Sequence, residues 1–448
     1  MQQLTDTLNQ LSNWLYAPYA LPLLLVFAGG YLTYQTGLVQ IRHFGTAVKQ
    51  ALGGMFSPKT EGEGTITSFQ ALSTALASTV GNGNIGGVAT AIVVGGPGAI
   101  FWMWVTALFG MATKYGEAVL AVKYREVDSR GKRQGGPMYY IKNGLGDNWK
   151  WLGFLFALFG TVAAFGIGNM VQSNSVADAL HSNFNVDPMI TGIVLAILVG
   201  LVIIGGVTRI GEVAGKLVPV MAIAYIAGSL LVIFANFGQI GNAFSLIFSS
   251  AFSGTAATGG FAGAAVWAAI RFGVARGVFS NEAGLGSAPI AHAAAQTNDP
   301  VRQGMIAMLG TFIDTILVCT MTALVIILTG AWTSGETGAS LSTLAYGQGI
   351  AGGNYIVTIG LVIFAFTTLI GWSYYGERCA EFIFGTAIII PYRIVWVVAV
   401  MTGALIKLNF VWLLADVMNG FMAIPNLIAL ALLSPVIFKV TKDYLNKN

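Results

Sequence analysis

Long apolar stretches follow one another along nearly the whole chain. Only 9% of its 448 residues are Asp, Glu, Lys or Arg, whereas a soluble domain carries about 25%. So few charges cannot cover a surface that faces water, and lipid must be the main solvent of this chain. Because stretches of about 20 apolar residues cross a bilayer as helices, we predict an all-α polytopic membrane protein.

About eleven stretches are long enough to span a bilayer. They lie at 18–37, 67–94, 97–121, 151–180, 188–206, 214–235, 258–295, 303–329, 353–377, 387–406 and 411–438. No polar segment between them is long enough to fold alone, so we predict a single transmembrane domain over 1–448.

Eleven spans divide into one peripheral first helix (18–37), a first repeat of five (67–235) and a second repeat of five (258–438). Because each repeat has an odd number of spans, the second lies inverted in the membrane relative to the first. Inverted repeats of this kind are typical of secondary transporters.

The basic residues give the orientation of the spans. Most of the 22 Lys and Arg residues lie in connections that follow odd-numbered spans, and the densest cluster falls in 114–150. Basic connections face the cytoplasm, so we predict an N-terminus outside and a C-terminus inside, in the cytoplasmic (inner) membrane. The cluster is then a cytoplasmic loop, and no nucleic-acid partner is needed to explain it.

The span at 67–94 contains four glycines in seven residues, from Gly81 to Gly87. Each Gly costs a helix about 1 kcal/mol relative to Ala, so we expect the helix to break here. A helix that ends near Val80 presents free carbonyls to a small cation, and one that starts near Asn84 presents N–H groups to a carboxylate. The alternative is a glycine face for close helix packing.

A second glycine-rich segment, 271–289, occupies the matching place in the second half. Interrupted helices at corresponding positions indicate a binding site near the middle of the membrane. This segment also holds Arg276 and Glu282, and charges at membrane depth are costly unless they are paired or meet water. We expect these two residues to form either an intracellular gate or a structural pair beside the break.

Asp314 is a lone acid within the span at 303–329. An intramembrane acid is a candidate functional residue, and here it is a possible coupling residue. The alternative is a structural role as the buried partner of Arg271 or Arg276.

Further polar residues lie within the fourth and ninth spans. Gln172 lies in the fourth, and the adjacent Thr367 and Thr368 lie in the ninth, with Trp372 four residues beyond Thr368. A threonine in a transmembrane helix often bonds its own i−4 carbonyl. The threonines by themselves therefore do not identify a site.

Several kinds of chemistry lack support in the sequence. The three histidines are far apart, and none neighbours a cysteine or a second histidine at metal-ligand spacing. The sequence contains no GxxxxGK[ST] phosphate loop and no GxSxG nucleophile motif. We therefore predict neither an enzyme nor a bound cofactor.

Four segments carry a family resemblance. The run 95–110, GGPGAIFWMWVTALFG, closely resembles the signature of the alanine or glycine:cation symporter family. The flanking stretch 67–87, the run GGPMYYI at 135–141 and the segment 273–289 also resemble that family. The likeness extends over essentially the whole chain after the first helix.

The resemblance implies a LeuT-like fold, in which a 5+5 inverted repeat contains two discontinuous helices and an extra helix precedes it. It also implies secondary active uptake of a small neutral amino acid, alanine or glycine and also D-alanine, by alternating access. The coupling ion is Na⁺, with H⁺ as a possibility.

By similarity, the substrate carboxylate meets the first break and the amine meets carbonyls of the second. The implied substrate-binding residues are Thr79, Gly81, Asn82, Gly83, Gln172, Val278, Phe279, Asn281, Thr368 and Trp372. Phe279 and Trp372 close the side-chain pocket in this interpretation, although ordinary aromatic packing explains them nearly as well. The implied Na⁺ ligands are Thr367 and Thr368 with the carbonyls of Ala77 and Val80.

Two other classes of protein remain as alternatives. A passive amino-acid channel or facilitator would show a continuous polar face or a filter ring, whereas the polar breaks here are localised. A non-transporting sensor would need an output domain, and the tail after Pro435 is too short for one. The sequence leaves open the oligomeric state and the stereochemistry of the substrate.

Overall fold

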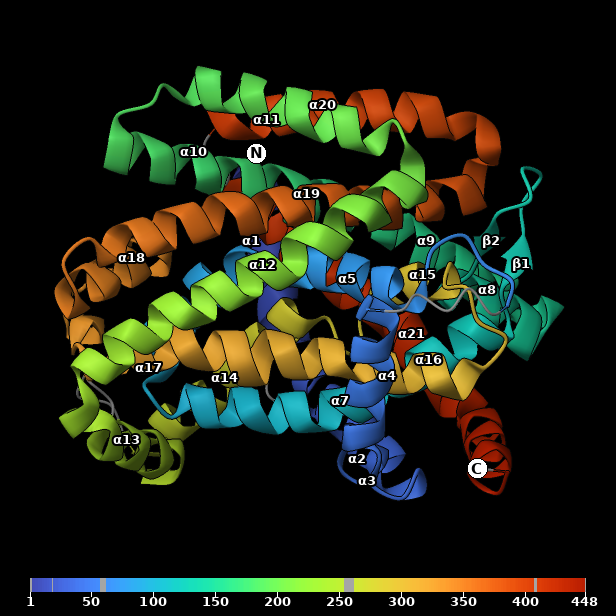
Figure 1. Ribbon diagram of the computed structural model, residues 1–448, viewed down its shortest axis with the longest axis horizontal. Coiled ribbons are helices and arrows are strands. Elements are labelled where there is room, and N and C mark those ends of the chain that lie inside the picture. The colour runs from blue at the N-terminus through green and yellow to red at the C-terminus, as the bar shows by residue number, and fades with distance from the viewer. Residues whose placement is uncertain (1, 18, 57–61, 254–261, 407–408, 448) are drawn as a thin grey trace.

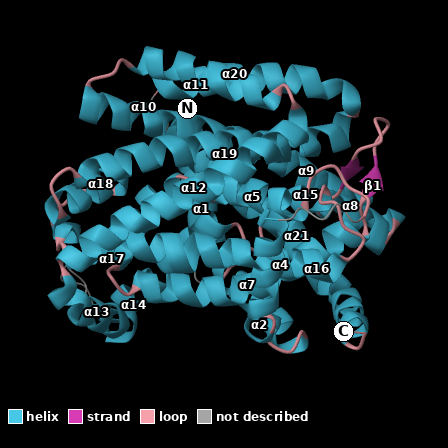
Figure 2. Cartoon of the chain, in the orientation of Figure 1, coloured by secondary structure: helices cyan, strands magenta, loops and turns pink. Residues whose placement is uncertain are grey.

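The computed structural model describes residues 2–17, 19–56, 62–253, 262–406 and 409–447. Almost all of them are helical, and the strands among them, β1 (Glu126–Val127) and β2 (Arg133–Gln134), pair as one short antiparallel hairpin (Figure 2). The long helices run roughly side by side, with this hairpin and the C-terminus at one end and α13 and α18 at the other (Figure 1). We call these the hairpin end and the opposite end. The predicted all-α class is confirmed.

The helices of the N-terminal part are α1 (Gln2–Leu15), α2 (Leu21–Gln35), α3 (Val39–Arg42), α4 (Phe44–Phe56), α5 (Ser68–Thr79), η1 (Gly83–Gly87), α6 (Val88–Gly95), α7 (Ala99–Lys123), α8 (Pro137–Tyr140), η2 (Ile141–Leu145), η3 (Asp147–Trp149), α9 (Lys150–Phe165), η4 (Gly166–Met170), α10 (Val171–Phe184), α11 (Pro188–Ile203) and α12 (Gly206–Ala235). The remainder are η5 (Phe237–Gln239), α13 (Ile240–Ser253), α14 (Ala262–Asn281), α15 (Ala288–Ala293), α16 (Pro300–Thr311), η6 (Phe312–Cys319), α17 (Thr320–Leu328), η7 (Ala331–Thr333), α18 (Gly338–Gly349), α19 (Gly353–Phe384), η8 (Thr386–Ile388), α20 (Ile389–Leu405) and α21 (Asn409–Leu445).

Six helical segments among the described residues are long and apolar enough to cross a membrane. They are Asp147–Phe184, Gly206–Ala235, Pro300–Leu328, Gly353–Phe384, Thr386–Leu405 and Phe410–Leu445. The count of eleven spans and the division into repeats remain predictions. Residue 18 of the predicted first helix and residues 258–261 and 407–408 of the predicted second repeat lie outside the described residues.

Local sequence signals explain several helix starts. α5 begins with a reciprocal capping box, in which Thr67 Oγ1 accepts from the Gln70 amide and Gln70 Oε1 accepts from the Thr67 amide. The carboxylate of Asp299 caps α16 by accepting from the amides of Val301 and Arg302. Both caps lie at the hairpin end, where two of the helices that matter most for the site enter the bundle.

The core consists of long helices packed along one another. α7 lies against α14 and α16, α9 lies against α19 and α21, and α11 lies against α20. The predicted map of spans did not include α4, α13 and α18. These helices mix polar and apolar residues along their length, so a search for uninterrupted apolar stretches does not find them.

Both glycine-rich segments are interrupted, as predicted. α5 ends at Thr79, Val80 adopts an extended conformation, and helical structure resumes at Asn82 and η1. α14 ends at Asn281. The next residue, Glu282, has a positive φ of 58°, and α15 begins only at Ala288. We call residues 80–81 the first break and residues 282–287 the second break.

One arginine joins both interrupted helices at the hairpin end. Arg125 donates hydrogen bonds to the carbonyls of Ala293, Ala295 and Thr297, at and beyond the end of α15, and to the carbonyl of Glu63 before α5. The same segments also pair through their backbones, since the amides of residues 65 and 66 donate to the carbonyl of residue 294. This Arg125 clasp joins the hairpin-end termini of the two interrupted helices.

A network of charges lies beside the clasp. Arg130 of the hairpin binds Asp128 of the same hairpin and Glu381 of α19. The buried Arg378 of α19 binds its neighbours Glu377 and Glu381. Burial alone would raise the pKa of Asp128, but hydrogen bonds from the Lys132 amide and from Arg130 outweigh it and bring this pKa below its usual value. Asp128 therefore keeps its charge near neutral pH and ties the hairpin to α19.

The Arg125 clasp predicts local protection of the backbone. Arg125→Leu removes the donors to four carbonyls, and a hydrogen bond to a charged group contributes about 1.5–3 kcal/mol. We expect the amides of residues 65–66 and 296–297 to exchange with deuterium about 10- to 100-fold faster. Arg302→Leu, at the same end, is the control and should leave their exchange unchanged. Equal exchange in both variants would contradict the clasp.

Candidate functional site

The two breaks face each other inside the bundle. A Cβ placed on Gly83 would lie 3.3 Å from the Cα of Ser280 and 3.4 Å from the ring of Phe279. Ser280 is buried and Phe279 is partly buried. Residues that sequence reasoning placed in two distant segments therefore meet in one place, with little room between them.

Side chains redirect the backbone amides of the first break. In a continuous helix the Gly81 amide would donate to the carbonyl of Ala77, but it donates to Asn84 Oδ1 at 2.9 Å. The Asn82 amide would donate to the carbonyl of Ser78, but it donates to Gln172 Oε1 at 3.3 Å. The carbonyls of Ala77 and Ser78, which these amides would have met, are thereby left for a ligand. Gln172 therefore lies beside the first break.

The second break is organised in the same way. The Ala283 amide, the helical partner of the Phe279 carbonyl, donates to Asn281 Oδ1 at 2.9 Å. The Gly284 amide, the helical partner of the Ser280 carbonyl, donates to Glu117 Oε1 at 3.1 Å. Both diversions free a carbonyl at the end of α14, where the helix dipole favours a cation.

Not all of the carbonyls that were predicted to meet the substrate amine at this break are free. The carbonyl of Val278 accepts from the Glu282 amide at 2.8 Å, and the carbonyl of Asn281 accepts from Lys114 Nζ at 2.7 Å. Both are engaged, so the free pair is Phe279 and Ser280. The sequence did not reveal this because the diverting groups come from another helix or from a neighbouring side chain.

Two threonines of α19 lie beside the first break. Thr368 Oγ1 lies 3.3 Å from the carbonyl of Val80 and 2.9 Å from that of Phe364, and Thr367 Oγ1 also lies 2.9 Å from the Phe364 carbonyl. A Cβ on Gly81 would lie 2.5 Å from Thr368 Oγ1, so only Gly allows this approach. Hydroxyls and carbonyls in this arrangement suit a hard monovalent cation.

Two of the predicted cation ligands are less directly placed. Thr367 Oγ1 also faces Met221 Sδ of α12 at 3.5 Å, so this hydroxyl lies farther round α19 from the break than that of Thr368. Ala77 contributes a carbonyl whose usual helical donor has been diverted. The carbonyl of Phe364, which both threonines share, was missed because nothing in its side chain indicates it.

Asp314 connects the two breaks. Asn84 donates to Asp314 Oδ1 at 2.6 Å, while Ser280 and Thr315 donate to Oδ2 at 2.9 and 2.7 Å. Asp314 lies in the π-helical segment η6 and is fully buried. The alternative role as partner of Arg271 or Arg276 is wrong, because its hydrogen-bond donors come from other residues.

The predicted pair of Arg276 and Glu282 does not form. Glu282 accepts from Trp372 Nε1 at 2.8 Å and from Ser287 Oγ. Arg276 lies over the ring of Phe279 at 5.5 Å, beside a small cavity of 80 Å³ that Asp416 also lines. Proximity in sequence suggested the pair, but the end of α14 separates the two side chains. Neither proposed role for the pair, as a gate or as a structural pair, is retained.

Aromatic rings surround the breaks. Phe279 stacks on Trp412 of α21 with a centroid distance of 6.1 Å, and Trp372 is buried against Tyr375 at 5.5 Å. A Cβ on Gly168 would lie 2.1 Å from the Cβ of Trp372, so this glycine lets α19 approach η4. Thr79 contributes little beyond packing in this state, because its hydroxyl bonds its own helix at Ala75 and Leu76.

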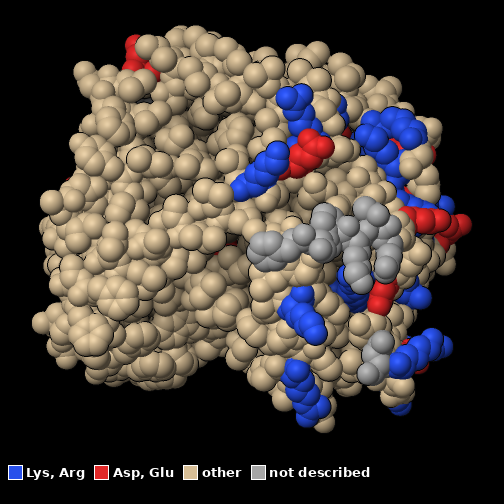
Figure 3. Space-filling model, viewed as in Figure 1, with Lys and Arg blue, Asp and Glu red and all other residues tan. Residues whose placement is uncertain are grey.

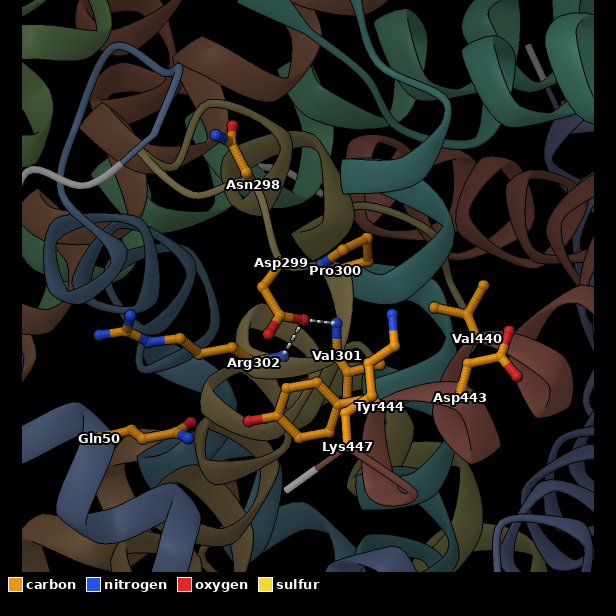
Figure 4. A pocket seen from close by; sticks show the side chains of 10 residues that line it. All are labelled: Gln50, Asn298, Asp299, Pro300, Val301, Arg302, Val440, Asp443, Tyr444 and Lys447. Atoms are coloured by element: carbon orange, nitrogen blue, oxygen red, sulfur yellow. Dashed lines mark hydrogen bonds between the residues drawn. The ribbon is translucent and has the colours of Figure 1, made fainter.

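A polar cavity leads from the first break toward the opposite end. It has a volume of about 600 Å³ and is lined by residues that include Asn82, Asp178, Glu336 and Trp412. A larger open cavity of about 800 Å³ lies at the hairpin end between α4, α16 and α21, and Figure 4 shows Arg302 and Tyr444 among its lining residues. The second cavity includes neither break, whereas the first reaches Asn82 beside the first break.

Comparison with known proteins agrees with this geometry. The family model described as the sodium:alanine symporter family matches residues 1–448. The chain belongs to the sodium:alanine symporter family. Over 442 residues the symporter is 54% identical to the sodium/alanine symporter AgcS of Methanococcus maripaludis, covering 97% of this chain and 96% of the relative. It is 39% identical to the probable sodium/glutamine symporter GlnT of Bacillus subtilis, over 99% of this chain and 92% of that relative.

Solved structures show the fold of the symporter. The crystal structure of MhsT in complex with L-phenylalanine aligns with a TM-score of 0.57 and 13% identity, over 85% of this chain and 98% of that one. A manganese transporter of Eremococcus coleocola aligns with a TM-score of 0.51 and 13% identity, over 86% and 82% of the two chains. At this identity the likeness concerns the fold alone.

The geometry of Thr368 predicts its effect on the cation. Thr368→Val keeps the shape and removes the hydroxyl, so we expect the half-saturating Na⁺ concentration for alanine binding to rise about tenfold or more. The matched control is Thr358→Val on the same helix, where the buried hydroxyl bonds the Asn354 carbonyl. Binding assays over a Na⁺ series in purified protein measure both, and an unaltered Na⁺ response in Thr368→Val would remove this residue from the cation site.

Proposed function

We propose that this protein couples inward movement of Na⁺ to uptake of a small neutral amino acid by alternating access. The paired breaks carry the proposal, because they bring freed carbonyls, hydroxyls and amides held by side chains together inside an apolar bundle. The family and the 54% identity to a sodium/alanine symporter support it. We propose alanine as the substrate, and also glycine and D-alanine.

The amino acid binds across the two breaks in this proposal. Its carboxylate meets N–H groups around Gly81–Gly83, in exchange for the side-chain oxygens of Asn84 and Gln172 that accept from the Gly81 and Asn82 amides without ligand. Its ammonium meets the freed carbonyls of Phe279 and Ser280 at the end of α14. The close approach of Gly83 to Phe279 leaves room for a small side chain only.

In this proposal, Na⁺ binds next to the carboxylate group of the amino acid. The carbonyls of Ala77, Val80 and Phe364 and the hydroxyls of Thr367 and Thr368 supply oxygen ligands of the kind that suits Na⁺. Asp314 with Asn84 and Ser280 offers a second position between the breaks for a coupling cation. If H⁺ drives uptake instead, Asp314 and Glu282 are the groups that carry the proton.

Topology follows from the distribution of charge. On the face shown in Figure 3, Lys and Arg gather toward the hairpin end and the C-terminus, and the half toward the opposite end is almost bare of them. The positive-inside rule then makes the hairpin end cytoplasmic and puts the N-terminus outside. We propose eleven spans in the 5+5 inverted arrangement. The cavity at the opposite end is the entrance, and the Arg125 clasp closes the exit.

One Na⁺ suffices energetically. A Na⁺ that crosses about 100 mV with a roughly tenfold gradient releases about 3.7 kcal/mol, enough for about 500-fold accumulation of a zwitterion.

Uptake into proteoliposomes tests the proposal. Labelled alanine should accumulate above equilibrium with an inward Na⁺ gradient and not with an inward H⁺ gradient or with none. Accumulation with H⁺ alone would transfer the coupling to Asp314 and Glu282. Equilibration without accumulation would indicate a passive facilitator, and saturable binding without any uptake would indicate a sensor.

A further inference from the structure

Helix α7 carries two opposite charges one turn apart in the middle of the bundle. Lys114 is 2% exposed and Glu117 is fully buried. Residues three apart on a helix share a face, yet these two form no ion pair with each other in the part of the chain that the structure describes. Glu117 binds the backbone of the second break instead, and Lys114 binds the last carbonyl of α14 beside it.

Glu117 binds the unwound backbone of the second break. Its Oε1 accepts from the amides of Gly284 and Gly286 at 3.1 Å each and from Asn426 Nδ2 at 2.6 Å. Asn426 in turn donates to the carbonyl of Gly284 at 2.9 Å. One carboxylate oxygen therefore fixes the unwound segment in place and draws the Gly284 amide away from the Ser280 carbonyl.

Lys114 binds the end of α14, just before the second break. Its Nζ donates to the carbonyl of Asn281, the last residue of α14, at 2.7 Å. A cation at a helix C-terminus is favourable because it complements the helix dipole. It also engages one of the carbonyls that a ligand's ammonium could otherwise use.

The use of charges here needs a reason beyond holding a bend. Buried charges in a membrane cost several kcal/mol, and the first break is held by the neutral side chains of Asn84 and Gln172. At the second break the charges divide the end of α14 into one engaged carbonyl, at Asn281, and two freed carbonyls, at Phe279 and Ser280. A primary ammonium has three N–H donors and can reach both freed oxygens.

We infer that Lys114 and Glu117 are positioning residues that select the primary ammonium group of the transported amino acid. They do so from α7, by setting which α14 carbonyls are free and where those carbonyls point. The inference rests on the proposed function and adds a specificity-determining pair to it. An N-methylated amino acid, with one donor fewer and a bulkier nitrogen, is the ligand that this arrangement rejects.

The test compares alanine with N-methylalanine as competitors of labelled alanine binding. In Glu117→Gln the neutral amide oxygen accepts more weakly than the carboxylate oxygen, which loosens its hold on the Gly284 amide and lets that amide return to the Ser280 carbonyl. We expect the inhibition constant for alanine to rise about tenfold or more and the preference over N-methylalanine to fall by a similar factor. The half-saturating Na⁺ concentration at saturating alanine should stay within about twofold.

Lys114→Met should lower the same preference, and Lys114→Arg should restore most of it because the charge and the donor are kept. The matched control is Glu377→Gln, a buried carboxylate in the hairpin-end network. It should leave the preference unchanged. If Glu117→Gln does not fold, as judged by thermal melting, the two Lys114 variants decide the question.

A preference for alanine over N-methylalanine that stays at the wild-type value in folded Glu117→Gln or Lys114→Met would overturn the inference. A purely structural role would only lower the amount of active protein, and this affects both ligands alike. Failure of the proposed function is distinguishable, because the wild-type protein would then show no Na⁺-dependent alanine uptake at all.

Discussion

Every peptide group inside a membrane needs a partner within the protein, and the two breaks are organised around that requirement. At each of them an asparagine accepts a backbone amide that would have closed the next helical turn. Asn84 takes the Gly81 amide and Asn281 takes the Ala283 amide. The amides are satisfied, whereas the carbonyls they would have met are left for ligands.

The surrounding helices extend this arrangement. Gln172 and Glu117 each take one more amide, and Thr368 places its hydroxyl against the carbonyl of Val80. Asp314 then joins the first break to the second through Asn84 and Ser280. A cation or an amino acid that binds at one break is therefore linked by direct hydrogen bonds to the other, which gives a physical route for coupling.

The sequence predicted what depends on local composition. The glycine clusters predicted the positions of both breaks, and Thr368 lies beside the Val80 carbonyl, where the family resemblance put it. The diverting groups were not predictable in the same way, because Glu117 belongs to a different helix and its role depends on packing. Arg276 shows the reverse error: its nearness in sequence to Glu282 suggested a pair, but the side chains lie on different sides of the end of α14.

The central claim is that the ligand's two charged groups are bound by the peptide groups of the two breaks. An experimental structure of the protein with alanine and Na⁺ tests it most directly. The account predicts the alanine ammonium at the carbonyls of Phe279 and Ser280, its carboxylate at Gly81–Gly83, and a cation between Val80 and Thr368. Alanine bound only in the polar cavity toward the opposite end, with both breaks unoccupied, would contradict the account.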